Sequence, residues 1–258
     1  MKSYKCLIGK TLKTALVIED DESLREFFVF DLEAAGFSAL SAEDGEKATQ
    51  ILSTTEVDVV VSDINIPKKT GIEILQELRT RKDPSKPAVV LITGDSELRL
   101  EDAYHLGINL FLLKPFNRQY LIDSVKRLSC VTSERWLPEN AKKLNAAWNS
   151  LGTMEISVES YEKAVQDKAL RFGQGGLFIT LSGDMPQPGE AIGFQITFEN
   201  DQDHPIVGEG IVRWIRTASL NGMPTGIGVE ILQMEPASIG TYAKILERDR
   251  PIAFIPKS

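Results

Sequence analysis

Short apolar runs alternate with segments of helical periodicity through the first 130 residues. The apolar runs are 14–18, 37–40, 88–92 and 108–113, together with a run inside the stretch 57–67. That run stops at Asp63. Between them, apolar residues at helical spacing predict helices over 23–36, 44–52, 70–81, 98–106 and 120–128. Apolar runs without polar alternation are typical of strands buried on both faces. The alternation therefore predicts an α/β fold with a five-stranded parallel, doubly wound sheet.

The pattern changes after residue 154, where short strands with period-two alternation are separated by Gly- and Pro-rich turns. We expect strands over 155–159, 177–181, 191–198, 206–207, 210–216 and 228–231, and a closing helix over 236–247. This spacing is typical of a small antiparallel β-barrel with a terminal helix. We therefore expect an α/β domain over 12–130, a linker with a short helix over 131–153, and a β domain over 154–250.

Polar residues follow the buried strands of the first domain. Glu19, Asp20 and Asp21 follow the first strand and Asp63 ends the third, while Thr93 and Lys114 follow the fourth and fifth. The carboxyl ends of parallel strands share one edge, where chemistry collects in such sheets. Converging carboxylates repel one another, and Mg²⁺, which prefers one or two carboxylates with water and phosphate, relieves that repulsion. A carboxylate is also a phosphoryl acceptor, and a lysine and a hydroxyl stabilise the phosphoryl oxygens.

Four motifs carry a resemblance to a known family. They are Val-Ile-Glu-Asp-Asp-Glu (17–22), Ser-Asp-Ile-Asn-Ile-Pro-Lys-Lys-Thr-Gly (62–71), Leu-Ile-Thr-Gly (91–94) and Phe-Leu-Leu-Lys-Pro-Phe (111–116). Residues 14–128 thus resemble a response-regulator receiver domain, which implies a flavodoxin-like fold. The resemblance implies phosphorylation of Asp63 by a sensor histidine kinase or phosphotransfer protein with Mg²⁺, and no enzymatic activity beyond slow autodephosphorylation.

The same resemblance implies roles for the residues at the strand ends. Mg²⁺ ligands would be Glu19, Asp20, Asp63 and the backbone carbonyl of Asn65, with Asp20–Asp21 as the alternative register of the acidic pair. Thr93 and Lys114 would contact the phosphoryl group, and the Lys114–Pro115 bond would be cis. Phe111 takes the place of the switch aromatic, through which the signal would reach the face formed by 98–106, 108–113 and 120–128. Whether it then passes to the barrel, to a second copy in a homodimer or to a partner protein stays open.

The second half resembles a PilZ-type domain. The stretches that carry this resemblance are 175–179, 188–189, 210–214 and 226–231. The family is a six-stranded barrel, and many members bind cyclic di-GMP through an Arg-x-x-x-Arg pair and an Asp/Asn-x-Ser-x-x-Gly turn. No Arg-x-x-x-Arg occurs between 136 and 170; at the turn Arg171 and Gly173 replace the acidic and serine positions, and only Gly176 is retained.

These departures set the expected output. Arg171, Arg213 and Arg216 are expected to be solvated or ion-paired surface charges, so the barrel is expected to be a degenerate output module that contacts an unidentified protein. The alternative is a cyclic di-GMP effector tuned by the receiver, with Arg171 and Gly176 as its candidate binding residues. A further alternative, a phosphatase of the haloacid type, requires an acid/base aspartate two residues after Asp63, where this chain has Asn65.

Charge and composition exclude other classes. The chain carries a net charge of −8, and each half, divided at residue 130, is net acidic. An acidic second half without a basic recognition helix argues against DNA binding. No apolar run approaches the roughly 18 residues of a membrane span. Cys6 and Cys130 have no metal-type spacing and suit a reducing cytoplasm, where we expect this protein.

Overall fold

The computed structural model describes residues 12–81, 83, 86–94, 99–130, 132–137 and 152–257. The chain divides into two compact units. The first comprises Met1–Arg99 with Leu106–Cys130, and the second comprises Leu100–His105 with Val131–Ser258. The expected linker helix near 141–148 lies outside the described residues. Within the described part of the chain, every helix is too short or too polar to cross a membrane.

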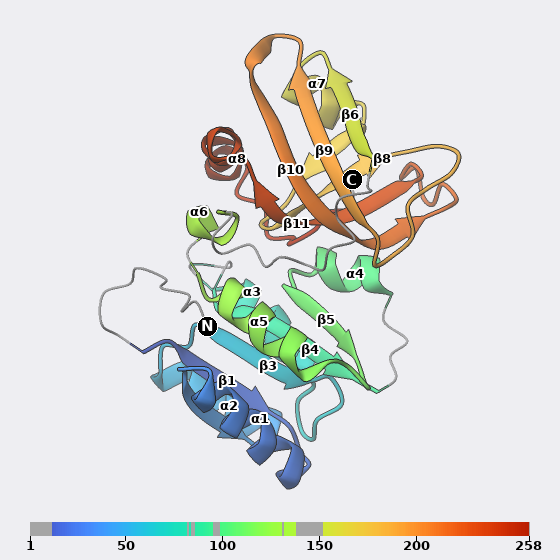
Figure 1. The fold of residues 1–258 in the computed structure, drawn as a ribbon. Helices are drawn as coiled ribbons and strands as arrows, with labels where there is room; N and C mark the ends of the chain where they lie inside the picture. The colour runs from blue at the N-terminus through green and yellow to red at the C-terminus, as the bar shows by residue number, and fades with distance from the viewer. Residues whose placement is uncertain are drawn as a thin grey trace. The chain divides into compact units, whose positions relative to one another are not determined.

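The first unit contains the expected parallel sheet with helices between its strands (Figure 1). Its strands are β1 (Thr14–Ile18), β2 (Ser38–Ala42), β3 (Val59–Asp63), β4 (Ala88–Thr93) and β5 (Leu110–Leu113). Its helices are α1 (Glu22–Ala34), α2 (Gly45–Thr54), α3 (Gly71–Arg79) and α5 (Arg118–Leu128). The sheet order is β2-β1-β3-β4-β5, with all pairs parallel. The prediction of a five-stranded parallel, doubly wound sheet is confirmed.

Local sequence explains where these helices begin. The side chains of Asp21, Asp44 and Asn117 each accept a hydrogen bond from a backbone N–H in the first turn of α1, α2 and α5. Thr70 and Glu73 form a reciprocal capping box at the start of α3. Such caps satisfy donors that a helix leaves unpaired at its N-terminus, and each contributes about 1 kcal/mol.

The core of the first unit is formed by the central strands. β3 and β4 are buried along their whole length, as the uninterrupted apolar runs predict. On one side of the sheet, α1 is joined to the start of α5 by an ion pair between Asp31 and Arg118 and by stacking of Phe28 on Phe116. The helices therefore cover the faces of the sheet and leave the ends of its strands as the place for polar functional residues.

The second unit contains a six-stranded sheet accompanied by helices (Figure 1). Its strands are β6 (Thr153–Val158), β7 (Leu170–Phe172), β8 (Gly176–Thr180), β9 (Ala191–Phe198), β10 (Asp201–Arg216) and β11 (Gly226–Met234). Its helices are α4 (Leu100–His105), α6 (Thr132–Arg135), α7 (Tyr161–Gln166) and α8 (Pro236–Asp249). The expected terminal helix corresponds to α8.

The predicted antiparallel barrel is wrong in two respects. β6 pairs with β9 in parallel, so the sheet is mixed. The strand order β6-β9-β10-β11-β8-β7 has two ends, and within the described residues no pairing joins β6 to β7. The parallel pair arises because α7 and β7–β8 intervene between β6 and β9. Sequence alternation specifies which face of a strand is buried and not the neighbour it chooses, so the pattern alone did not reveal this pairing.

Aromatic residues fill the core of the second unit. Trp136 packs edge-on against Tyr242 of α8, with ring centroids 5.0 Å apart. The Tyr242 hydroxyl lies 2.8 Å from the Gly173 carbonyl oxygen and 3.0 Å from that of Gly176. A buried tyrosine needs such a partner for its hydroxyl. Tyr242 thereby fixes the turn between β7 and β8 onto α8.

Candidate functional site

The candidate site lies where the strand order of the parallel sheet changes direction. β1 and β3 are neighbours, yet the chain moves outward from them to β2 on one side and to β4 and β5 on the other. Ligands of open α/β sheets bind at the carboxyl ends of strands at such a switch point. Glu19 follows β1 and Asp63 ends β3 at this point.

Asp63 is almost buried, and both of its carboxylate oxygens are hydrogen-bonded. Its Oδ1 accepts from the backbone N–H of Asn65 at 2.8 Å, and its Oδ2 accepts from Lys114 Nζ at 2.6 Å. The exposed fraction of Asp63 is 9%. The carboxylate is thus held in one orientation at the edge of the sheet.

Lys114 also binds Glu19, and so joins the two carboxylates. The distance from Lys114 Nζ to Glu19 Oε2 is 3.1 Å, and Glu19 is 3% exposed. Burial raises the pKa of Glu19, and the neighbouring charge of Asp63 adds to the rise, against the opposing effect of Lys114. Burial by itself would lower the pKa of Lys114, but its hydrogen bonds to Asp63 and Glu19 outweigh that effect and raise it. In the cluster formed by Glu19, Asp63 and Lys114, the pKa values of Glu19 and Lys114 therefore each depend on the charges of the other members.

The other two acidic residues after β1 have different environments. Asp20 is exposed, and its backbone carbonyl accepts from Arg25 at 3.2 Å. Asp21 is committed to helix capping, since its Oδ1 accepts from the Leu24 backbone N–H at 2.8 Å. Asp20 is thus an exposed carboxylate that follows Glu19 in the chain, whereas Asp21 is part of the start of α1.

Thr93, Phe111 and Asn65 complete the set that the sequence predicts. Thr93 ends β4 and is completely buried, and its carbonyl accepts from the Lys114 backbone N–H at 2.8 Å. Phe111 lies in β5 opposite Leu91 of β4 and is buried at 9% exposure. Asn65 is exposed just beyond Asp63. The Lys114–Pro115 bond is cis, as expected.

The donor set of this cluster suits a hard divalent cation. Mg²⁺ takes oxygen ligands and uses only one or two carboxylates, the remainder being water and phosphate. Glu19, Asp20 and Asp63 are oxygen donors that follow or end neighbouring strands of the sheet. Within the described residues, no group of three His, Cys, Asp or Glu side chains is arranged to hold a metal ion by itself. A cation held here would therefore depend on water and phosphate oxygens in addition to carboxylates.

Replacing Lys114 with methionine is expected to make the stability of the first unit more sensitive to pH. Lys114 opposes the raised pKa of Glu19, so its loss should raise that pKa further. A folded-state pKa above the ordinary value of 4.5 means that the folded state binds the proton more tightly. The contribution of Glu19 to the free energy of unfolding should therefore be present below pH 4.5 and be lost as the pH rises through the higher pKa that Glu19 has in the folded state.

Hydrogen exchange of β1 and β3 amides, compared with wild type at each pH, measures this effect. Lys13→Met is the matched control, because Lys13 pairs with Asp58 at 2.9 Å in a half-exposed position where an ion pair contributes little. Equal pH dependence of the two variants would contradict the coupling of Glu19 to Lys114.

The candidate binding residues of the second unit differ in their burial and in their partners. Arg171 is half-buried in β7, and its Nε has no hydrogen-bond partner among the described residues. Gly176 begins β8, and a Cβ there would lie 2.2 Å from the Val229 carbonyl oxygen, so it is a packing glycine. Arg213 is ion-paired with Glu230 and Arg216 with Glu101. The prediction that Arg213 and Arg216 are ion-paired holds, but neither is a solvated surface charge.

The buried pair of Arg216 and Glu101 was missed by sequence reasoning. Both side chains are almost inaccessible, at 3% and 4% exposure. One signal was available, because Val212, Trp214 and Arg216 alternate along β10 and therefore share the buried side of the strand. The partner was not visible, since Glu101 lies 115 residues earlier in the chain.

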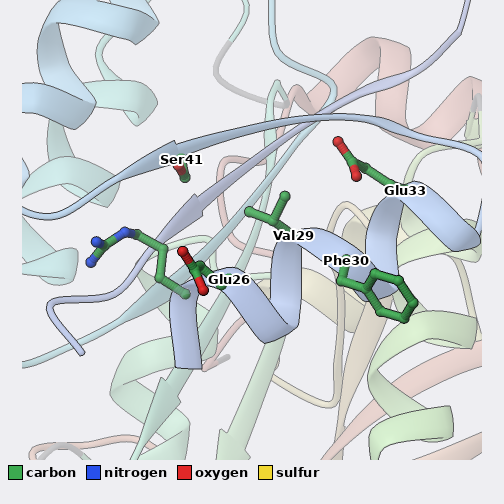
Figure 2. A pocket seen from close by; sticks show the side chains of 6 residues that line it. Glu26, Val29, Phe30, Glu33 and Ser41 are labelled. Carbon is green, nitrogen blue, oxygen red and sulfur yellow. The ribbon is translucent and has the colours of Figure 1, made fainter. Parts of the chain in front are cut away.

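An open hollow lies between α1 and the outer strand of the first unit, β2. Figure 2 shows the side chains of α1 and Ser41 of β2 that line it. Its volume is about 320 Å³, and it is lined by Arg25, Glu26, Val29, Phe30, Glu33 and Ser41. None of the residues predicted to receive a phosphoryl group or a metal lines it.

Comparison with known proteins gives a match for the first part of the chain. A family model described as "Response regulator receiver domain" matches residues 15–126. The alkaline phosphatase synthesis transcriptional regulatory protein PhoP of Bacillus subtilis (strain 168) is 29% identical over 160 residues, which are 61% of this chain and 66% of PhoP. The regulatory protein VirG of Agrobacterium tumefaciens (strain 15955) is 34% identical over 121 residues, 45% of this chain and 43% of VirG. This chain thus spans 43% to 66% of these relatives' lengths.

Solved structures are similar over the same part. The chemotaxis response regulator CheY4 of Vibrio cholerae is 27% identical and covers 46% of this chain and 99% of its own, with a TM-score of 0.42. The response regulator protein TrrA of Thermotoga maritima, in complex with Mg²⁺–BeF, is 29% identical and covers 45% of this chain and 99% of its own, with a TM-score of 0.41.

Proposed function

Because residues 15–126 are a response regulator receiver domain, we propose that this chain is a two-component response regulator phosphorylated on Asp63. The observation that carries the proposal is the position of Asp63 at the switch point, where it shares Lys114 with Glu19. The phosphoryl donor is a sensor histidine kinase or a phosphotransfer protein. Asp63→Asn tests the assignment, with the expected result given in the Discussion.

The chemistry is the transfer of a phosphoryl group to a carboxylate. An oxygen of Asp63 attacks phosphorus, the bond from phosphorus to the donor's imidazole nitrogen breaks, and an acyl phosphate forms. Lys114, already hydrogen-bonded to Asp63, neutralises charge on the phosphoryl oxygens, and Thr93 supplies a hydroxyl from the end of β4. Phosphorylation alters the partners of Lys114 and Thr93, and Phe111 on the adjoining strand transmits the change.

Mg²⁺ is the proposed cofactor of this transfer. Glu19, Asp20, Asp63 and the backbone carbonyl of Asn65 would hold it, and the bound ion offsets the charge that develops on the transferred group. The register Glu19–Asp20 is supported by two contacts: Glu19 is in the cluster with Lys114, and Asp21 caps α1.

We expect Asp20→Asn to raise the Mg²⁺ concentration required for phosphorylation of Asp63, because a neutral amide is a poorer ligand for a hard cation than a carboxylate. The measurement is the rate of phosphorylation by acetyl phosphate as Mg²⁺ is titrated. Asp21→Asn is the matched control, since asparagine caps a helix as well as aspartate does. A larger effect of Asp21→Asn would reverse the register in favour of Asp20–Asp21.

The second unit is proposed to be a degenerate PilZ-like output module that contacts a protein. Six strands and the closing helix α8 support this, while the parallel pairing of β6 with β9 departs from the family's antiparallel barrel. Arg213 and Arg216 are engaged by carboxylates, which leaves them ill placed to grip a phosphate. Arg171 is the remaining candidate for contact with a nucleotide.

Titration calorimetry of the full chain with cyclic di-GMP is expected to show no binding, because two guanidinium groups are needed to grip and stack on this ligand. Arg171→Ala provides the comparison. Micromolar binding by the wild-type chain that this substitution abolishes would overturn the degenerate-module proposal and favour a cyclic di-GMP effector.

A further inference from the structure

Asp63 is followed by a loop, residues 64–70, that leads from β3 to α3. Ile64 and Ile66 are buried, whereas Asn65 between them is exposed. The Asn65 backbone N–H donates to Asp63 Oδ1 at 2.8 Å, and the Asn65 carbonyl is a proposed Mg²⁺ ligand. We call residues 64–70 the acceptor loop, because their backbone orients the acceptor carboxylate.

The acceptor loop contains a strained turn at Lys68. The φ angle of Lys68 is 66°, in the left-handed region that favours glycine. The Lys69 backbone N–H donates to the Pro67 carbonyl at 2.8 Å, which closes a three-residue turn around Lys68. A residue other than glycine keeps such a conformation only where its surroundings hold it. The turn therefore depends on contacts from outside the loop.

The start of α2 supplies these contacts. The Gly45 backbone N–H donates to the same Pro67 carbonyl at 3.2 Å. Lys68 Nζ lies 2.6 Å from Asp44 Oδ2, and Asp44 Oδ1 accepts from the Lys47 backbone N–H at 2.8 Å, which caps α2. Asp44 thus holds both the first turn of α2 and the strained turn of the acceptor loop.

Two glycines pack closely against the chain at the ends of the acceptor loop. A Cβ on Gly45 would lie 2.1 Å from the Lys69 carbonyl oxygen, and a Cβ on Gly71 would lie 2.6 Å from the Asp63 carbonyl oxygen. Both neighbours are backbone atoms, so a larger side chain at either position displaces the chain itself. The Gly71 backbone N–H also donates to the Ile64 carbonyl at 3.0 Å. The loop is therefore held at both ends.

We infer that Asp44 and Gly45, at the start of α2, are positioning residues for the proposed Mg²⁺ site. The inference rests on the proposed function. The two residues are not ligands; they act by holding the acceptor loop, and so the Asn65 carbonyl, in place before the ion binds. Mg²⁺ demands nearly ideal octahedral geometry, so a displaced carbonyl weakens binding. Loss of contacts that support metal ligands typically lowers metal affinity by about 10- to 100-fold.

Gly45→Ala in the full chain tests this inference. The added Cβ should displace the Lys69 carbonyl and with it the acceptor loop. Titration of the metal-free chain with MgCl₂, followed through the Asn65 amide resonance, measures the dissociation constant for Mg²⁺. That constant should rise by at least about tenfold. The Mg²⁺ concentration that gives half the maximal rate of phosphorylation by acetyl phosphate should rise by the same factor.

Lys68→Met is a second variant, and it introduces no additional Cβ into the close contact with α2. It removes the ion pairs of Lys68 with Asp44 and, at 3.5 Å, with Glu46. Because Lys68 is half-exposed, the dissociation constant for Mg²⁺ should rise by only about two- to fivefold. Lys68→Arg keeps the charge and should restore the wild-type value, which would tie the effect to the contact with Asp44.

Gly36→Ala is the matched control for Gly45→Ala. Gly36 has a φ of 95° and open space around its Cβ position, so alanine there strains the first unit without touching the acceptor loop. The dissociation constant for Mg²⁺ should equal that of the wild-type chain. An equal rise in Gly36→Ala and Gly45→Ala would assign the effect to lost stability and overturn the inference.

The same titrations distinguish failure of this inference from failure of the proposed function. A wild-type dissociation constant in Gly45→Ala, or in Lys68→Met should Gly45→Ala not fold, would overturn the positioning role and leave the proposed function standing. An Asn65 resonance that does not shift when MgCl₂ is added to the wild-type chain would refute Mg²⁺ as the cofactor, and this inference with it.

Discussion

Asp63→Asn is expected to abolish phosphorylation of the chain. The carboxamide lacks the anionic oxygen that attacks phosphorus. Of the neighbouring carboxylates, Glu19 is buried against Lys114, Asp21 caps α1, and Asp20 is the proposed Mg²⁺ ligand. Incubation of the full chain with acetyl phosphate and Mg²⁺ should add the mass of one phosphoryl group to the wild-type chain and none to the variant. Digestion and mass spectrometry should place the modification on the peptide that contains Asp63.

Asp58→Asn is the matched control for this experiment. Asp58 precedes β3 at the opposite end of the strand, where it accepts from the Thr14 backbone N–H at 2.8 Å and from Lys13 at 2.9 Å. It should be phosphorylated like the wild-type chain. Phosphorylation that persists in Asp63→Asn, or that is lost in Asp58→Asn, would refute the assignment of the acceptor.

Phe254→Ala is expected to destabilise the second unit by about 3–5 kcal/mol, the usual cost of removing a buried phenylalanine ring. Phe254 is 1% exposed and stacks on Tyr104, and its ring covers Gly175. The vacated space borders Gly175, which has no side chain to fill it, and the rigid ring of Tyr104.

Denaturant unfolding followed by tryptophan fluorescence measures this loss selectively. All three tryptophans of the chain follow residue 130, so their emission reports the second unit. Ile252→Ala is the control in the same segment, because Ile252 is 50% exposed and should change the unfolding free energy little. Similar midpoints for Phe254→Ala and Ile252→Ala would show that the terminal segment contributes nothing to the core.

The local features of the first unit were predictable from the sequence. Uninterrupted runs such as Val59–Val61 indicated strands buried on both faces, and polar residues at the strand ends indicated the edge with the chemistry. The sequence favours Glu19–Asp20 as the acidic pair and leaves Asp20–Asp21 as the alternative. The three-dimensional arrangement adds two contacts that the sequence does not show, because Asp21 caps a helix and Glu19 lies beside Lys114.

The second unit shows the opposite balance. Its alternation specified which residues face inward, but alternation is the same for parallel and antiparallel neighbours, so the pairing of β6 with β9 was not predictable. The partner of Arg216 was not predictable either. The sequence places this charged residue on the buried side of a strand, but it does not show which carboxylate pairs with it.

The sequence by itself determined the parallel sheet, its strand-end carboxylates and lysine, and the candidate acceptor Asp63. These depend on periodicity and chain order, which are properties of short segments. Only the tertiary structure decided the mixed sheet, the pairing of Glu101 with Arg216 and the membership of α4 in the second unit. These features depend on contacts between segments that lie far apart in the sequence. A buried polar group must find a partner, and the packing of the whole chain decides which segment supplies it.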